Sequence, residues 1–366
     1  MTRPKIGLVL GGGGIRGLAH IGVLEVLHRE QIPIDLIVGT SMGGIVGVLF
    51  GLGYTPSEIV EEMARMQSKP FNKALTEHLS QKSTTDWAWV AGIGGLTGLL
   101  FVAARQLLNR AKGREATHLF DPLIGMGLGG VVGLLAALGQ APQNGGDPKQ
   151  QLLSVEMLSS RGRQRQLERQ LAEALADKTF ADLSVPTTVM AVDMLHGCEV
   201  PLNEGPLLPI VLASSAVPGA FPPVKYQDME LADGGVIDSL ATHVAFEQGA
   251  EKVIAVDVYP PLEKQNPWTD PVSAIMGLQL PPSVFSTSGT GNDRIPTAAA
   301  SMWRSVRVMT WHLHQERLAT HPPDVLLCPD VGRYGSLDFK DVTGPFDAGI
   351  IEAERHLPQL KALLQT

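Results

Sequence analysis

The sequence has few cysteines and few charged residues. Only Cys198 and Cys328 occur, far apart in the chain, so neither a disulfide framework nor a metal site of clustered thiolates can form. This cysteine content fits a reducing compartment. Charged residues make up 18% of the chain and the formal net charge is -8. A broad basic surface is therefore not expected, and we predict no nucleic-acid partner.

A signal-peptide pattern is also lacking. Two basic residues, Arg3 and Lys5, stand before a short apolar run from Ile6 to Leu10, which passes directly into four glycines. This run is too short for the apolar core of a signal peptide, and no small-residue cleavage site follows it. We therefore expect a cytoplasmic protein that is not secreted through a cleavable signal peptide.

Short apolar runs alternate with helical patterns along the 366 residues, a length that permits one large domain or two ordinary ones. Ile6 to Leu10 precedes a helical pattern from Ile15 to Gln31, and Ile32 to Val38 precedes another from Ile45 to Gly51. Further apolar runs cover Thr187 to Val192, Ile210 to Ala213 and Val253 to Val258, and further helical stretches cover Gln164 to Ala176 and Val236 to Gln248. This alternation predicts a three-layer α/β/α fold with a mainly parallel central sheet.

A segment of different character, residues 84–146, interrupts this pattern. Trp87 to Ala104 and Pro122 to Gly146 carry no charge, and their glycines recur at the spacing that lets helices pack closely in lipid. As a helix, the first run would be ~27 Å long, close to the ~30 Å core of a bilayer. We expect an apolar helical hairpin that associates the protein with a membrane surface or bilayer through residues 87–139. Arg105 to Asp121, which connects the two runs, carries four basic and two acidic residues. Because basic residues tend to stay on the cytoplasmic side, this connector favours a re-entrant or interfacial hairpin over a full crossing. A buried pair of lid helices is the alternative.

The first motif with chemical meaning is Gly39-Thr40-Ser41-Met42-Gly43. It fits the pattern G-x-S-x-G on a turn from a strand to a helix, where small flanking residues permit the sharp backbone that exposes a serine hydroxyl. Ser41 is therefore a candidate nucleophile. The alternative is an ordinary glycine-rich turn in which Ser41 caps the following helix.

A nucleophilic serine needs a base, which in related motifs is a histidine oriented by an acid. Five histidines lie downstream, and none stands out by its surroundings: His243, His312, His314, His321 and His356. A sharper candidate is Asp233, which ends a short apolar run and precedes Gly234 and Gly235, two residues that allow close approach of the backbone. The alternative is a common Asp-Gly turn.

The loop Gly11 to Gly17 contains G-x-G-x-x-G at Gly12, Gly14 and Gly17, a pattern found in dinucleotide-binding folds. Such folds need an acidic residue at the far end of the second strand, but Asp35 stands at its beginning. We therefore predict no dinucleotide and no other cofactor. The same amides suit a different anion, the oxygen that becomes negative when Ser41 attacks a carbonyl, at about 3 kcal/mol per donor.

With these motifs in this order, the sequence resembles the patatin-like phospholipases, serine lipid acyl hydrolases with a Ser-Asp dyad. The matching segments are Gly12-Gly13-Gly14-Ile15-Arg16-Gly17, Gly39-Thr40-Ser41-Met42-Gly43, Asp233-Gly234-Gly235 and the block from Ala213 to Pro223. The resemblance is to the bacterial type, from which the segment 84–146 departs. It implies a catalytic domain over residues 5–258, interrupted by 84–146, and a C-terminal extension over 259–366 packed on the same domain.

The resemblance also implies a function. The chain would be an enzyme that cleaves carboxylic ester bonds of phospholipids or related acyl lipids, with Ser41 as nucleophile and Asp233 as proton acceptor. The implied oxyanion hole is Gly12, Gly13 and Gly14, and the supporting motif residues are Arg16, Gly17, Gly39, Gly43, Gly234 and Gly235. An acyltransferase with the same dyad and a non-catalytic membrane-associated protein on this fold are the alternatives.

Two further expectations concern charge at the site. Arg16 is expected to shape the glycine-rich loop, while contact with a lipid phosphate or with solvent alone remains open. No metal is predicted, because no cysteine, histidine and carboxylate ligands cluster beside the motifs in the sequence.

Overall fold

The structure is a computed structural model that describes residues 3–68, 160–218, 220–262, 298–335, 341 and 343–365. The predicted hairpin in residues 84–146 lies outside the described residues. Met1–Lys69 and Arg163–Thr366 form one compact unit, and the description below concerns that unit. Of the helices in the described ranges, none is both long and apolar enough to cross a bilayer.

One sheet of eight strands organises the described part of the chain. The strands are β1 (Ile6–Leu10), β2 (Leu36–Thr40), β3 (Thr187–Asp193), β4 (Cys198–Leu202), β5 (Val224–Tyr226), β6 (Met229–Asp233), β7 (Lys252–Val256) and β8 (Val325–Leu327). The α-helices are α1 (Ala19–Arg29), α2 (Met42–Gly51), α3 (Pro56–Ser68), α8 (Ser160–Leu175), α9 (Leu207–Ser214), α10 (Thr242–Glu247), α12 (Ala298–Thr320), α13 (Thr343–Arg355) and α14 (Leu357–Ala362). Short 3-10 turns are η1 (Gly14–Leu18), η2 (Phe180–Asp182) and η3 (Gly234–Val236).

The sheet is mainly parallel. β1 pairs in parallel with β2 and β7, β2 pairs in parallel with β3, and β7 with β8. β3 also pairs antiparallel with β4 and β6, and β6 with β5. The predicted α/β fold with a mainly parallel central sheet is confirmed, with an antiparallel region added beside β3.

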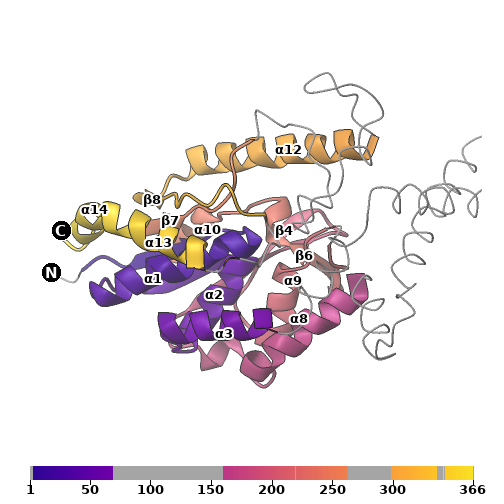
Figure 1. Ribbon diagram of the computed structural model, residues 1–366, viewed down its shortest axis with the longest axis horizontal. Helices are drawn as coiled ribbons and strands as arrows, with labels where there is room; N and C mark the ends of the chain where they lie inside the picture. The colour runs from indigo at the N-terminus through magenta and orange to yellow at the C-terminus, as the bar shows by residue number, and fades with distance from the viewer. Residues whose placement is uncertain are drawn as a thin grey trace, which may run out of the picture. The chain divides into compact units, whose positions relative to one another are not determined.

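Helices cover both faces of the sheet (Figure 1). Successive side chains of a strand point to opposite faces, and accordingly Leu8 and Leu10 belong to one buried cluster while Val9 belongs to a second. The first cluster includes side chains of α1, α2, α3 and α9, and the second includes side chains of α10. The predicted three layers are therefore present.

The ends of β2 and β6 meet along one edge of β3. β2 pairs with β3 as far as Thr40 opposite Met190, and β6 pairs with β3 from Asp233 opposite Ala191. β4 pairs with the same β3 residues as both of these strands, so it occupies the other edge of β3. β2 and β6 therefore lie end to end, and Ser41 follows directly where they meet.

Two expectations for individual elements are wrong. Ile210 to Ala213 is not a strand but the middle of helix α9, whose side chains are buried on nearly all sides. A short run that is apolar all round has no helical periodicity, so periodicity cannot distinguish it from a buried strand. The helix expected over Val236 to Gln248 is shorter, because the 3-10 turn η3 and a non-helical stretch of turn and bend residues precede α10.

Segments beyond residue 259 take part in the same unit. β8 extends the sheet beside β7, and α13 packs along α1. Figure 1 shows α13 and α14 beside the N-terminal α1, at the end of the molecule where both chain termini lie.

Candidate active site

Ser41 occupies a strained turn between β2 and α2. Its φ of 55° and ψ of -120° lie in a region that residues other than glycine rarely adopt. A Cβ atom on Gly39 would stand 2.5 Å from the carbonyl oxygen of Gly43, so the two ends of the motif touch through backbone alone. Ser41 is followed at once by helix α2, whose first turn includes Gly43. The predicted sharp turn from strand to helix is present.

The structure brings Asp233 to Ser41, since β2 and β6 end at neighbouring residues of β3. The Ser41 side chain lies close enough to the Asp233 carboxylate to lower its pKa. Asp233 is 5% exposed and its Oδ1 also accepts a hydrogen bond of 2.8 Å from the N–H of Gly235. Gly234 and Gly235 begin the turn η3 that carries the chain away from the sheet.

Burial sets the proton affinity of this carboxyl group. Removal from water raises the pKa of Asp233 to about 6, against the lowering effects of the Ser41 side chain and the Gly235 hydrogen bond. A raised pKa makes Asp233 a stronger base than an ordinary aspartate, while the group is still mostly ionised at neutral pH. Among the described residues, no histidine bonds to Ser41 or Asp233.

The glycine-rich loop lies against Ser41, but its amides differ in what they can do. A Cβ atom on Gly12 would stand 3.5 Å from the Cβ of Ser41. The N–H of Gly12 donates to the carbonyl of Ser239 at 2.9 Å, so it is already engaged. Within the described ranges the N–H of Gly13 has no hydrogen-bond acceptor, and Gly14 starts the turn η1, where a first amide has none inside the turn.

Backbone conformation explains part of this loop. Gly14 has a φ of 59°, in the left-handed region that favours glycine. Arg16 is buried, and its Nε donates to the carbonyl of Tyr334 at 2.8 Å, which ties the loop to the C-terminal part of the chain. Gly17 lies in η1, against the side chain of Met42 that follows Ser41.

His20 forms a hydrogen bond with the start of the glycine-rich loop. It is fully buried, and its Nε2 lies 2.7 Å from the carbonyl oxygen of Gly11. Burial lowers the pKa of His20 to about 4, so the ring is neutral at pH 7 and donates through Nε2. The sequence patterns did not identify this residue, since its position at the start of a helix carries no catalytic signature.

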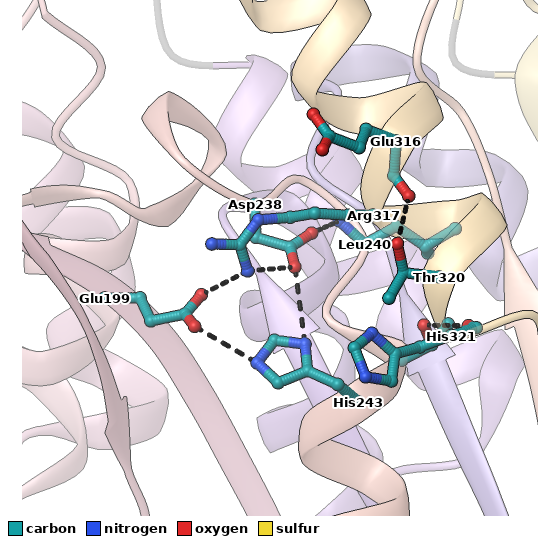
Figure 2. A network of polar contacts seen from close by, with 9 residues as sticks. Glu199, Asp238, Leu240, His243, Glu316, Arg317, Thr320 and His321 are labelled. Atoms are coloured by element: carbon teal, nitrogen blue, oxygen red, sulfur yellow. Dashed lines mark hydrogen bonds and ion pairs between the residues drawn. The ribbon is translucent and has the colours of Figure 1, made fainter.

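A polar network joins Asp238, which follows the turn η3, to side chains of β4, α10 and α12 (Figure 2). Arg317 on α12 donates through Nη1 to Glu199 on β4 at 2.8 Å and to Asp238 at 3.0 Å. His243 on α10 lies 3.2 Å from Glu199 and 3.5 Å from Asp238, and its pKa is raised by the hydrogen bond with Glu199. Asp238 precedes Ser239, which receives the Gly12 amide, so this network borders the glycine-rich loop.

Glu199, Asp238 and His243 are also the donor types that a metal ion would use, and their ligand atoms lie within 4.8 Å of one another. No such group was expected from the sequence, because its members come from separate elements. The guanidinium of Arg317 bonds both carboxylates and supplies positive charge to them. The positive charge of Arg317 therefore already compensates the negative charges of Glu199 and Asp238.

The other candidate histidines have partners elsewhere. His314 bonds Asp257 at 2.9 Å, and the ring of His312 lies against Trp311. The ring of His321 is tilted against that of His243, with centroids 5.5 Å apart, and Nδ1 of His356 lies 3.0 Å from the carbonyl oxygen of Glu352.

Ser214 is a second residue that the sequence patterns did not assign a role. It ends helix α9 and is fully buried. Its hydroxyl accepts a hydrogen bond of 2.8 Å from the N–H of Ser41 and donates one of 2.7 Å to the carbonyl of Met190. The one indication of a role in the sequence was that Ser214 belongs to the block from Ala213 to Pro223.

Comparison with known proteins agrees with the motifs. The model of the family described as patatin-like phospholipase matches residues 8–246 of this chain, which confirms the predicted resemblance. Lysophospholipase NTE1 of Candida albicans is 25% identical over 95% of this chain and 19% of its own length. An uncharacterized NTE family protein of Mycobacterium bovis, Mb1092c, is 26% identical over 70% of this chain and 50% of its own length. The chain thus spans half or less of these relatives.

A solved structure, VipD from Legionella pneumophila, is also similar to this chain. The match has a TM-score of 0.39 and 12% sequence identity, and it covers 98% of this chain and 67% of that one.

Proposed function

We propose that this chain, which belongs to the patatin-like phospholipase family, hydrolyses carboxylic ester bonds of acyl lipids through a Ser-Asp dyad. The observation that carries the proposal is that β2 and β6 end at neighbouring residues of β3 and so bring Ser41 beside the buried carboxylate of Asp233. A base in contact with a serine hydroxyl is what nucleophilic catalysis requires. The family description indicates phospholipids or related acyl lipids as the substrate class.

In the proposed reaction, Oγ of Ser41 attacks the ester carbonyl carbon while its proton passes to Asp233. The carbonyl oxygen takes the negative charge, and the amides of Gly13 and Gly14 stabilise it at about 3 kcal/mol per donor. When the intermediate collapses, the proton goes to the leaving alcohol and the acyl group stays on Ser41. Water then attacks the acyl ester and gives a proton to Asp233. When this second intermediate collapses, the bond between the acyl group and Oγ of Ser41 breaks, the proton returns from Asp233 to Oγ, and the fatty acid leaves.

Gly12 has a different part in this proposal from the one expected from the sequence. The N–H of Gly12 donates to the carbonyl of Ser239, so it is not a donor to the oxyanion. Gly12 instead lets the loop backbone lie close to Ser41. The proposed donors to the oxyanion are therefore the N–H groups of Gly13 and Gly14. Arg16 shapes the loop through its bond to Tyr334. Gly39, Gly43, Gly234 and Gly235 shape the two turns that carry Ser41 and Asp233.

We also propose, from the sequence alone, that residues 87–139 bring the enzyme to a membrane surface or bilayer. The two uncharged runs carry apolar surface that lipid would cover. A lipid substrate resides in such a surface, so attachment would place the enzyme where its substrate is concentrated.

The decisive experiment is labelling with a fluorophosphonate probe, followed by a panel of lipid esters. We expect covalent labelling of Ser41 in the full chain and none in Ser41→Ala. Ser215→Ala is the matched control and should be fully labelled, because the Ser215 hydroxyl has no hydrogen-bond partner in the described part of the chain. Release of free fatty acid by water identifies a hydrolase. Transfer of the acyl group to an added alcohol in its place would indicate an acyltransferase, and no labelling would indicate a non-catalytic protein.

A further inference from the structure

The hydroxyl of Ser214 stands where the hydrogen-bond ladder between β2 and β3 would otherwise continue. The N–H of Ile37 donates to the carbonyl of Pro186 at 2.8 Å. In a parallel ladder such donors recur at every second residue, so the series that starts at Ile37 reaches Ser41. Its acceptor, counted in the same steps from Pro186, would be the carbonyl of Met190.

The ladder does not close at this point. The N–H of Ser41 donates to Oγ of Ser214 at 2.8 Å, and this hydroxyl donates to the carbonyl of Met190 at 2.7 Å. A side chain from helix α9 is thus inserted between two strands that pair directly one step earlier. Two hydrogen bonds in series hold the Ser41 amide farther from Met190 than a single bond of ~2.9 Å would.

We propose that Ser214 is a positioning residue that keeps Ser41 out of the ladder and so in its reactive turn. A φ of 55° at a serine persists only where the surroundings hold it, and the inserted hydroxyl is a contact made to that residue's own amide. The inference rests on the proposed function, because the turn matters only if Ser41 is the nucleophile.

The same segment also reaches the other member of the dyad. The N–H of Asp233 donates to the carbonyl of Ala216 at 3.1 Å, two residues after Ser214. Ser214 itself is fully buried, so no water competes for its hydroxyl. The stretch that ends α9 therefore fixes the backbone of both Ser41 and Asp233, and Ser214 is the part that acts through a side chain.

Neighbouring residues supply a matched control. The hydroxyl of Ser215 is also buried, but in the described part of the chain it has no hydrogen-bond partner. Ser214→Ala and Ser215→Ala each remove one buried hydroxyl at adjacent positions, and only the first touches the Ser41 amide. A second pair, Ser214→Thr and Ser214→Val, has equal shape and differs in the hydroxyl alone.

The test compares these variants in the full chain by the rate of fluorophosphonate labelling at Ser41 and by kcat and KM on a short-chain ester. We expect Ser214→Ala to label and turn over roughly 10²-fold more slowly, with KM little changed, as for a nucleophile displaced by about 1 Å. Ser215→Ala should behave as wild type, and Ser214→Thr should exceed Ser214→Val in both rates. Circular dichroism of each variant checks that the compared proteins are folded.

Hydrogen exchange provides a reading that does not depend on activity. The Ser41 amide should exchange faster in Ser214→Ala than in wild type, while peptides from β1 stay unchanged. Equal labelling rates in Ser214→Ala and Ser215→Ala overturn the inference and leave the proposed function intact. If the wild-type chain is not labelled at all, the proposed function fails, and unchanged exchange at Ser41 then overturns the inference as well.

Discussion

Replacing Asp233 by asparagine should abolish turnover and yet raise the stability of the fold at neutral pH. Burial raises the pKa of Asp233 from 3.8 to about 6 in the folded chain. Between these two values the unfolded chain has released the proton while the folded chain keeps it, so stability falls as the pH rises. A shift of about two pKa units corresponds to roughly 3 kcal/mol of stability that is lost once the pH passes 6.

Asparagine avoids this cost because it carries no charge. Its Oδ1 can still accept the N–H of Gly235, which donates to Asp233 at 2.8 Å in the wild type. We expect Asp233→Asn to be about 1–3 kcal/mol more stable than wild type at pH 7, a difference that shrinks to nothing near pH 4. Stability gained where activity is lost is typical of residues held in place for chemistry.

The assay is denaturant unfolding of both proteins between pH 4 and pH 8. Asp228→Asn, which removes an exposed carboxylate from the turn between β5 and β6, is the control. A variant less stable than wild type at pH 7, or a stability difference that stays constant from pH 4 to pH 8, would refute the reasoning. Either result would mean that the Asp233 carboxylate is well solvated or strongly stabilised in the fold.

The same pKa predicts how activity depends on pH. In the proposed reaction only the ionised form of Asp233 accepts the Ser41 proton, and with a pKa of about 6 this form is about 90% of the total at pH 7 and about 10% at pH 5. The profile of kcat/KM should therefore fall on the acid side with a midpoint near pH 6. An acid limb below pH 5 would contradict the assigned environment.

Four further outcomes test other parts of the site. His243→Asn should retain substantial turnover, because His243 bonds Glu199 and not the dyad, and a loss as large as in Asp233→Asn would replace the dyad by a triad. Chelation of divalent metals should leave turnover unchanged, since Arg317 compensates the charges of Glu199 and Asp238. A loss of turnover on chelation that is reversed by added metal would overturn this prediction. Gly14→Ala should lower kcat roughly 10²-fold with a smaller change in KM, because an alanine is strained at the φ of 59° that Gly14 adopts in the loop. Wild-type kinetics of this variant would contradict a role for Gly14 in the site. Deleting residues 84–146 should release the protein from membranes, where the full chain resists a salt wash but yields to detergent, and should leave labelling of Ser41 intact; a deletion that unfolds the protein would assign the segment to the core.

Sequence reasoning succeeds here where a feature is local. The turn at Ser41 could be predicted because the glycines that permit it stand within two residues, and the parallel sheet because its strands alternate with helices. It fails at α9, where burial on nearly all sides removes the periodicity that separates a helix from a strand. It also gives no sign of the Arg317 network, whose members come from β4, α10, α12 and the loop after η3.

The contact between Ser41 and Asp233 depends on a strand that carries neither residue. β2 runs parallel to β3 and ends opposite Met190, while β6 runs antiparallel to β3 and ends opposite Ala191, so the two strand ends meet head to head. A slip of one residue in either register would turn a side chain to the other face of the sheet and separate the pair. Motifs identify Ser41 and Asp233 one at a time, but the register on β3 decides whether the two lie close enough for the proposed proton transfer. Substitutions in β3 that shift this register should therefore lower kcat even though no side chain of β3 takes part in the proposed reaction.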